Sequence, residues 1–131
     1  CIIVTRPKDD IDYPFMDKAR EVWRANQDAA SVYVAAMEKG GFVDCNVAVH
    51  GFPVEMPLEA WIDMVRDRMW STFSEVHFSN AELESGLEEI RTKYPPDSNG
   101  NIRFEERLVL IQGLKSESSC LTRFAEGARN L

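Results

Sequence analysis

The sequence predicts a mixed α/β fold with the element order strand, helix, strand, helix, helix, strand. Three observations predict it: a short apolar run at the start, a long stretch of helical periodicity that ends at two glycines, and an alternating segment directly after them. With 131 residues, of which 44% are hydrophobic and 28% charged, the composition is typical of one globular domain.

The first three elements follow from residues 1–50. Residues 1–5 (Cys-Ile-Ile-Val-Thr) are continuously apolar and largely β-branched, which favours a strand buried on both faces. From about Pro14, apolar residues recur at helical spacing, and Gly40-Gly41 ends the pattern, so we expect one long helix. Residues 42–50 alternate as a strand does. Two strands joined by a helix favour a right-handed parallel crossover.

The second half of the chain predicts two helices and a last strand. Gly51-Phe52-Pro53 is expected to break the preceding strand, and Pro57 to open a helix as its first residue. After a loop at residues 71–74, Ser79 and Glu82 have the spacing of a capping box. Pro95-Pro96 forbids continuation of the helix that this box starts.

The remaining residues predict a turn, a strand and a tail. Residues 97–100 (Asp-Ser-Asn-Gly) are typical of a turn, and the residues from Ile102 to Ile111 predict one strand of about ten residues, or two short strands with a bulge. The tail, 116–131, has a weak helical pattern and is expected to be weakly helical or disordered.

Charge and cysteine usage limit the classes of partner. Fifteen basic against 22 acidic residues give a net charge of -7, which disfavours nucleic acid and anionic membranes. No apolar stretch approaches the roughly 20 residues of a membrane-spanning helix. Three cysteines, Cys1, Cys45 and Cys120, are odd in number and far apart, so we expect reduced thiols and a cytoplasmic location.

No motif in the sequence completes a metal or nucleotide site. Asp97 and Asn99 resemble the start of a calcium loop, but Ile102 stands where that loop needs glycine, which favours a plain polar turn. His50 and His77 lack companions for a zinc site, although either could accept a proton. A small hydrolase using Ser74 and His77 is a minor alternative without a recognisable orienting acid.

The densest group of polar and aromatic residues spans 61–78 and has two interpretations. Its guanidinium, hydroxyl and aromatic groups could line a small-molecule pocket. Alternatively, Arg66 and Arg68 could pair with Asp63 and Asp67 on a solvated helix.

Together these segments resemble the C-terminal half of a class I S-adenosylmethionine-dependent methyltransferase of the small-molecule, trans-aconitate-methyltransferase-like type. The resemblance extends over residues 1 to about 115. It is carried by the order of four segments that resemble the fifth strand with its exit loop, the helix–GGF–strand six junction, the Arg-x-x-Ser insertion and the closing seventh strand: 1–7, 37–42, 61–74, and 102–104 with 108–115.

The resemblance implies a C-terminal half of a Rossmann-like methyltransferase sheet, with a helical cap at about 57–95. In that family the glycine-rich loop and the ribose-binding acid lie in the N-terminal half, and neither is in this sequence. We therefore expect S-adenosylmethionine to bind the parent enzyme but not this chain alone. The missing N-terminal half, or a second copy of the chain, should cover strand 1–5. The alternative is a non-catalytic binding or assembly module derived from that fold.

The resemblance also implies which residues face the small-molecule acceptor. If the acceptor is a carboxylate, one or the other of two arginines could clamp it, one or the other of two hydroxyls could add a hydrogen bond, and two aromatic rings could exclude water. These substrate-side residues are Arg6 and Arg68, Ser71 and Thr72, and Trp70 and Phe73. No catalytic residue is assigned.

Overall fold

A computed structural model describes residues 1–116, which fold as two compact units built from interleaved segments. Within the described residues, unit 1 contains Cys1–Pro7, Asp28–His50 and 108–116; unit 2 contains Lys8–Gln27 and Gly51–Arg107. Three strands form one sheet in the order β1-β3-β2: β1 (Ile2–Thr5), β2 (Phe42–Pro57) and β3 (Asn101–Lys115). The predicted mixed α/β class is confirmed.

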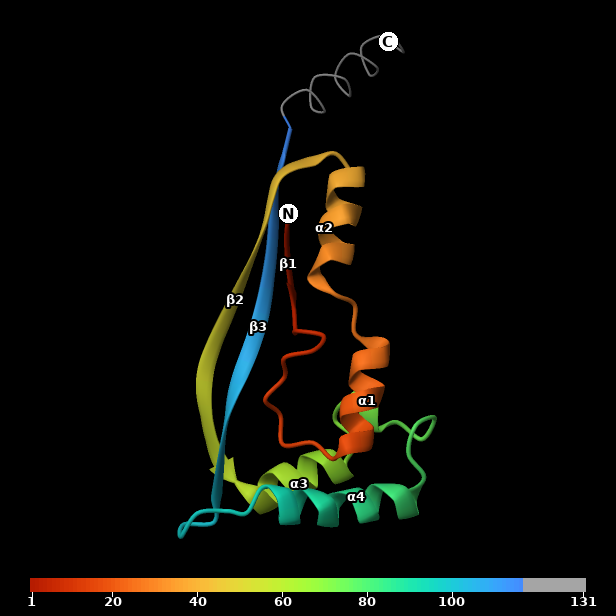
Figure 1. Ribbon diagram of the computed structural model, residues 1–131, viewed down its shortest axis with the longest axis vertical. Helices are drawn as coiled ribbons and strands as arrows, with labels where there is room; N and C mark the ends of the chain where they lie inside the picture. Colours follow the sequence, from red (N-terminus) through yellow and green to blue (C-terminus); the bar gives the residue numbers. More distant parts are fainter. Residues whose placement is uncertain (117–131) are drawn as a thin grey trace, which may run out of the picture. The chain divides into compact units, whose positions relative to one another are not determined.

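The direction of the strands differs from a simple parallel crossover. β3 runs antiparallel to β1, with Ile3 opposite Ile111, and antiparallel to β2 (Figure 1). β1 and β2 therefore run in the same direction, but β3 lies between them. The central place suits β3 because its residues near Val109 are apolar on both faces, whereas β1 is short and β2 contains Pro53, a residue that sheets tolerate at an edge.

Unit 1 has a small core on one face of the strands. Met37 of α2 (Ala30–Lys39) packs with Val109 and Ile111 of β3 and with Ile3 of β1. Gly113 allows this close packing, because a Cβ there would lie 2.8 Å from Met37 Cε and 2.9 Å from Cys45 Sγ.

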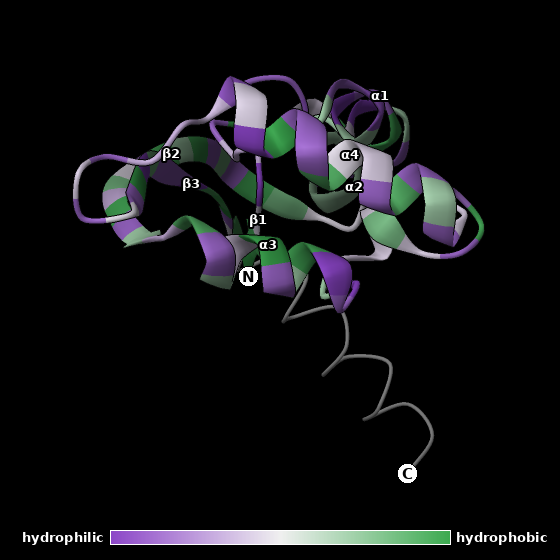
Figure 2. Cartoon of the chain, turned by 90° about the horizontal axis from the view of Figure 1, so that it is seen from below, coloured by the Kyte–Doolittle hydropathy of each residue, from purple (hydrophilic) through white to green (hydrophobic). Residues whose placement is uncertain are grey.

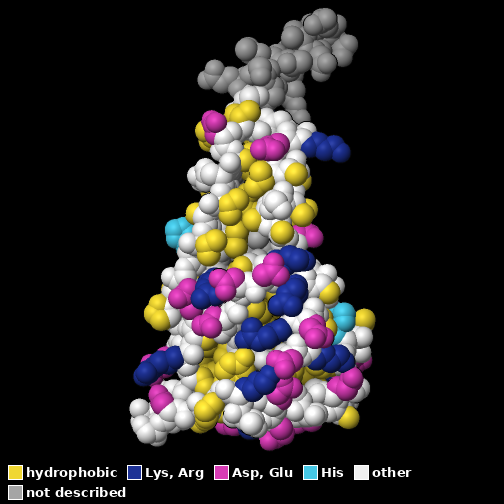
Figure 3. Space-filling view, in the orientation of Figure 1, with side chains coloured by type: hydrophobic (Ala, Val, Ile, Leu, Met, Phe, Trp, Pro, Cys, Tyr) yellow, Lys and Arg dark blue, Asp and Glu magenta, His cyan; other side chains and the backbone are white. Residues whose placement is uncertain are grey.

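The expected burial of the first strand on both faces is wrong within the described chain. Side chains alternate along β1, so Ile3 faces the core while Ile2 and Val4 are 67% and 58% exposed. Hydrophobic side chains accordingly gather over the strands of unit 1 in the upper half of Figure 3. β1 is also an edge strand, so one of its hydrogen-bonding edges has no partner strand among the described residues.

The single long helix predicted from Pro14 to Gly40 is two helices, α1 (Asp17–Asn26) in unit 2 and α2 in unit 1. Gln27 has extended dihedral angles (φ -94°, ψ 126°) and ends α1. Lys8 Nζ donates to the carbonyl oxygens of Arg24, at 2.7 Å, and Gln27, at 3.0 Å. These bonds satisfy carbonyls that a helix end leaves free, so a residue distant in sequence stabilises the break.

The predicted break of the second strand at Gly51-Phe52-Pro53 is also wrong, because β2 continues to Pro57. Pro53 is compatible with β2 as an edge strand. The Glu105 side chain lies against Gly51. Gly51-Phe52-Pro53 is therefore accommodated inside an edge strand instead of forming a turn.

Unit 2 has the larger core, which is rich in aromatic rings. It is formed by α1, by α3 (Leu58–Arg66), by the short helix η1 (Ser71–Phe73) and by α4 (Asn80–Lys93). Pro57 is the N-cap of α3 rather than its first residue. Both α3 and α4 alternate hydrophobic and hydrophilic residues around their surface (Figure 2). The largest fully buried core side chains of this unit are Trp61, Phe15, Phe73 and Phe78.

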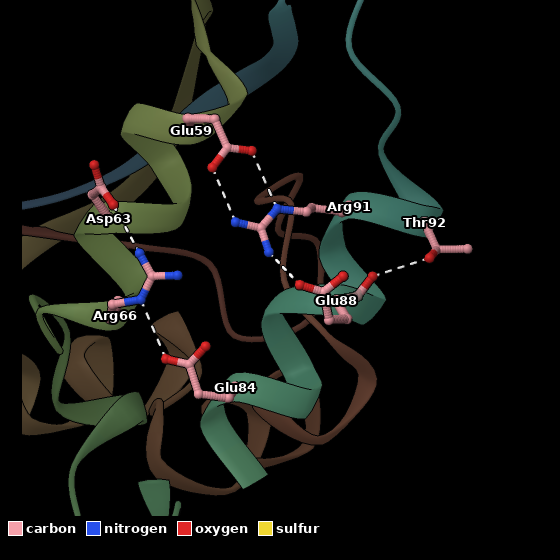
Figure 4. A network of polar contacts seen from close by, with 7 residues as sticks. All are labelled: Glu59, Asp63, Arg66, Glu84, Glu88, Arg91 and Thr92. Atoms are coloured by element: carbon pink, nitrogen blue, oxygen red, sulfur yellow. Dashed lines mark hydrogen bonds and ion pairs between the residues drawn. The ribbon is translucent and has the colours of Figure 1, made fainter. Parts of the chain in front are cut away.

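A network of ion pairs joins the outer surfaces of α3 and α4 (Figure 4). Arg91 Nε and Nη2 donate to the two carboxylate oxygens of Glu59, at 3.2 and 3.0 Å, and Nη1 bonds Glu88. This arrangement lowers the pKa of Glu59 and raises the pKa of Arg91 above its ordinary range. Arg66 similarly bridges Asp63 and Glu84. Because these carboxylates are exposed, we expect the network to orient α3 and α4 relative to each other but to add little to the free energy of unfolding.

The capping box of α4 is confirmed. The Ser79 hydroxyl accepts from the Glu82 amide at 3.2 Å, and Glu82 Oε2 accepts from the Ser79 amide at 2.8 Å. Helix α4 ends before Pro95-Pro96 as predicted. The predicted turn is also present: Gly100 has φ +82°, and Asp97 Oδ1 accepts from two backbone amides. One strand of 15 residues follows it, longer than expected.

The Glu82 carboxylate should make stability depend on pH in the acid range. A hydrogen bond from Lys18, followed by the Ser79 amide, lowers the pKa of Glu82 from 4.5 to about 2. A lowered folded-state pKa contributes stability above the unfolded value, near pH 4.5, and that contribution is lost as pH falls through about 2.

We therefore expect Glu82→Gln to make the decrease in unfolding free energy between about pH 5 and pH 2 shallower than in wild type. Urea unfolding followed by circular dichroism at several pH values measures it. Lys18→Met, which removes the largest cause of the shift, should change the slope in the same direction. Parallel pH profiles for wild type and Glu82→Gln would contradict the assignment.

The remaining predictions concern the tail, membrane-spanning helices and the cysteines. The expected tail lies outside the described residues except for Ser116. Among the helices of the described chain, none is long and apolar enough to cross a membrane. Cys1 and Cys45 are free thiols, and the cytoplasmic location stays a prediction.

Candidate functional site

The loop between α3 and α4 is held by Arg68. Its guanidinium Nη1 donates to the carbonyl oxygens of Phe73 and of Phe78 (3.1 Å for the latter), and Nη2 donates to Asn80 Oδ1 at 3.0 Å. Arg68 also has a left-handed backbone, with φ +54°. One side chain therefore fixes both ends of the loop at residues 73–78. The sequence alternative in which Arg68 pairs with a neighbouring carboxylate is wrong, whereas Arg66 does pair with Asp63, at 2.9 Å.

This loop and α1 form a cleft of about 270 Å³. Helix α1 contributes one lining residue at its C-terminal end, η1 contributes two, and the segment after η1 contributes the rest. We call it the hydroxyl cleft, and its lining residues are Asn26, Ser71, Thr72, Ser74, Val76 and His77. Its volume is near the lower end for small-molecule sites, and its lining combines several polar groups with one apolar side chain.

The polar side chains of the hydroxyl cleft lack internal partners. Within residues 1–116, the hydroxyls of Ser71, Thr72 and Ser74 and the imidazole of His77 make no hydrogen bond. Thr72 is only 7% exposed. No fully enclosed side-chain polar atom of the described chain is left unsatisfied, so the Thr72 oxygen keeps some exposure, and Thr72 lines the cleft. These groups are thus available to a bound molecule.

The structure brings together only some of the predicted site residues. Ser71 and Thr72 line the hydroxyl cleft, as their predicted role requires. Phe73 is fully buried and packs edge-to-face on Phe15, with ring centroids 4.9 Å apart. Trp70 packs against Trp61 at 5.1 Å. Phe73 therefore belongs to the core of unit 2, and Trp70 is partly buried and packs against that core.

The two arginines predicted to clamp a carboxylate lie in different units. Arg6 follows the end of β1 in unit 1, and Arg68 belongs to unit 2. Arg68 uses its guanidinium on loop carbonyls, so few of its donors are left for a ligand. In the described chain, neither arginine lines the hydroxyl cleft.

Asn26 lines the hydroxyl cleft but is not among the site residues predicted from the sequence. In the sequence it falls on the apolar face of the expected long helix. In the structure its Nδ2 donates to Val22 O at 2.8 Å, while its Oδ1 has no partner among the described residues. An asparagine on an otherwise apolar helical face is the one indication that the sequence offers.

A second cleft in unit 2, about 330 Å³, is the main competitor. It is lined by Tyr94, the turn after α4 and the start of β3. Its charged groups are already engaged: Arg103 bonds Glu55 at 3.1 Å, and the amides of Asn101 and Asn99 lower the pKa of Asp97. The hydroxyl cleft, whose polar groups lack partners, is therefore the better candidate for ligand binding.

The hydroxyl cleft does not have the arrangement of a hydrolase. Ser74 and His77 both line it, but no hydrogen bond joins their side chains, and no carboxylate lines the cleft to orient the imidazole. Among the described residues, no group of three or more histidine, cysteine or acidic side chains could hold a metal ion. The chemistry available is hydrogen bonding to a small molecule.

A comparison of the sequence with models of known protein families finds no match, and a comparison with curated proteins finds none either.

Proposed function

We propose that this chain is the acceptor-binding portion of an S-adenosylmethionine-dependent small-molecule methyltransferase and lacks the half that binds the methyl donor. The chain would then bind and orient the methyl acceptor, and would be inactive without the donor half. Methyl transfer depends mainly on holding donor and acceptor in line, so an acceptor site alone should produce no reaction.

The strand order is the single observation that carries this proposal. In the family that this chain resembles, a seventh strand closes the sheet, and residues 102–104 and 108–115 resemble that strand. Their strand, β3, lies between β1 and β2 and runs antiparallel to β1, which is compatible with a closing strand and supports the proposal.

The helices between the last two strands support the proposal further. Helices α3, η1 and α4 occupy residues 58–93, between β2 and β3. In the family that this chain resembles, an insertion at this point caps the active site. The hydroxyl cleft is built by this segment together with the C-terminal end of α1. Its hydroxyls are the groups that could hold an acceptor.

The described residues do not fit S-adenosylmethionine itself. A donor site of this class needs backbone amides at the start of a helix that follows a strand. The glycine pair here lies at the opposite end, after α2, and both amides are used: Gly40 N bonds Ala36 O, and Gly41 N bonds Glu38 O, each at 3.0 Å. The amides of Gly40 and Gly41 are therefore not available to a methyl donor.

Binding of S-adenosylmethionine tests the proposal. Calorimetric titration of the 131-residue chain should give no heat of binding, whereas the protein purified from its native source should bind the compound. Intact mass and N-terminal sequencing of the native protein should then reveal an upstream glycine-rich segment. Tight binding by the chain alone, or a native protein without such a segment, would contradict the proposal.

A second candidate function is a non-catalytic assembly module, favoured by the exposure of Ile2 and Val4 on the edge strand β1. In this case a second copy or another protein would cover β1. Sedimentation equilibrium discriminates: a concentration-dependent dimer that Val4→Lys dissociates favours assembly. A stable monomer over a wide concentration range counts against a second copy as the partner.

A further inference from the structure

The hydroxyl cleft carries information about the kind of molecule it binds. Its lining contains three hydroxyls, one carboxamide, one imidazole and one valine side chain, and no lysine, arginine, aspartate or glutamate. A site for a carboxylate or phosphate normally places a cation or several convergent backbone amides against the anion. The two arginines nearest in sequence are engaged elsewhere: Arg24 pairs with Asp9 at 3.1 Å, and the guanidinium of Arg68 is bonded to Phe73 O, Phe78 O and Asn80.

We infer that the hydroxyl cleft binds an uncharged molecule that carries a hydroxyl group next to a small apolar body, and not a carboxylate. The inference rests on the proposed function only in taking this molecule to be the methyl acceptor. It replaces the carboxylate clamp expected from the sequence, because the structure uses Arg68 to hold the loop.

The unpartnered groups explain the preference. A hydroxyl group is both a donor and an acceptor, so the hydroxyls of Ser71, Thr72 and Ser74 can match an alcohol in either sense. Asn26 Oδ1 adds an acceptor for the ligand's own O–H. A carboxylate offers only acceptors, so it would leave Asn26 Oδ1 without a donor and bring a charge beside a lining that contains no lysine or arginine.

Thr72 is the most informative member of the cleft. Its side chain is 7% exposed and lacks a partner within residues 1–116, so it can discriminate between ligands that do and do not complete its hydrogen bonding. A ligand that pairs with a nearly buried hydroxyl gains more than one that pairs with an exposed group, because water competes less well there. Val76, 87% exposed, offers an apolar contact at the mouth of the cleft.

The experiment compares two probes of similar shape, benzyl alcohol and benzoate, in amide correlation spectra of the isotope-labelled 131-residue chain. Benzyl alcohol should shift the amides of residues 71–77 and the His77 ring resonances saturably, and benzoate should not. Thr72→Val should weaken benzyl alcohol binding about fivefold to tenfold. Thr92→Val is the matched control, since the Thr92 hydroxyl bonds Glu88 O on the exposed surface of α4.

Benzoate shifting the same amides as strongly, unchanged binding by Thr72→Val, or no saturable shift with either probe would overturn the inference. These failures are distinct from failure of the methyltransferase proposal. If the native protein fails to bind S-adenosylmethionine while this chain still binds benzyl alcohol through Thr72, that result would contradict the proposed function but would support the inferred ligand class.

Discussion

Replacing Trp61 with alanine should lower the free energy of unfolding by about 3–5 kcal/mol. The Trp61 side chain is 2% exposed and lies among Tyr13, Phe15, Trp70 and Phe104, with ring centroids 4.9–6.0 Å away. Its Nε1 donates to Pro14 O at 2.8 Å in a buried setting. The substitution would therefore leave a cavity, and it would also leave the buried carbonyl oxygen of Pro14 without a hydrogen-bond donor.

Urea unfolding followed by far-ultraviolet circular dichroism measures this loss without depending on the deleted fluorophore. A typical domain is stable by only about 5–15 kcal/mol, so Trp61→Ala should remove a large fraction of the total. Trp61→Phe separates the two contributions, since it keeps a ring but loses the donor. Val76→Ala is the control and should cost less than about 0.5 kcal/mol, because Val76 is 87% exposed. A loss below 1 kcal/mol for Trp61→Ala would show that Trp61 is not central to the core.

Replacing Arg68 with methionine should cost about 2–3 kcal/mol and release the loop that lines the hydroxyl cleft. The guanidinium satisfies the carbonyl oxygens of two buried residues, Phe73 and Phe78, and methionine can satisfy neither. Lysine should restore little, because a single ammonium cannot reproduce the guanidinium fork. Since about 1.4 kcal/mol corresponds to a factor of ten, amide exchange in residues 71–78 should accelerate roughly 30-fold or more.

The readouts for Arg68 are native-state hydrogen exchange and benzyl alcohol binding, and both should change together. Arg66→Met is a matched control on the same segment: its partners Asp63 and Glu84 are exposed carboxylates, so the expected cost is below about 1 kcal/mol, with the cleft intact. If Arg68→Met left exchange of the loop unchanged, Arg68 would not be the residue that positions the hydroxyls.

Predictions based on local sequence were accurate where local chemistry decides. The capping box at Ser79 and Glu82 requires only a hydroxyl and a carboxylate three residues apart, and both bonds form. Pro95-Pro96 ends its helix because proline removes a donor and clashes with the preceding turn. Short-range rules of this kind need no knowledge of the rest of the chain.

The errors share one physical cause, which is that neighbours distant in sequence overrode local preference. The expected long helix divides at Gln27, where Lys8 binds the freed carbonyls. Gly51 and Pro53, which locally favour a turn, lie within β2, which pairs with β3 as an edge strand. In the candidate site, Ser71 and Thr72 could be predicted from their clustering, but Asn26 comes from another helix and could not.

The sequence by itself determined the α/β class, the ends of α4 and the hydroxyl-rich character of the segment after α3. These properties depend on periodicity, capping and proline chemistry, which act over a few residues. Only the tertiary structure decided that β3 lies between β1 and β2, that Phe73 belongs to the core, and that Arg68 holds the loop. Strand neighbours and side-chain partners are chosen by packing and hydrogen bonding between distant segments, which a linear pattern does not specify.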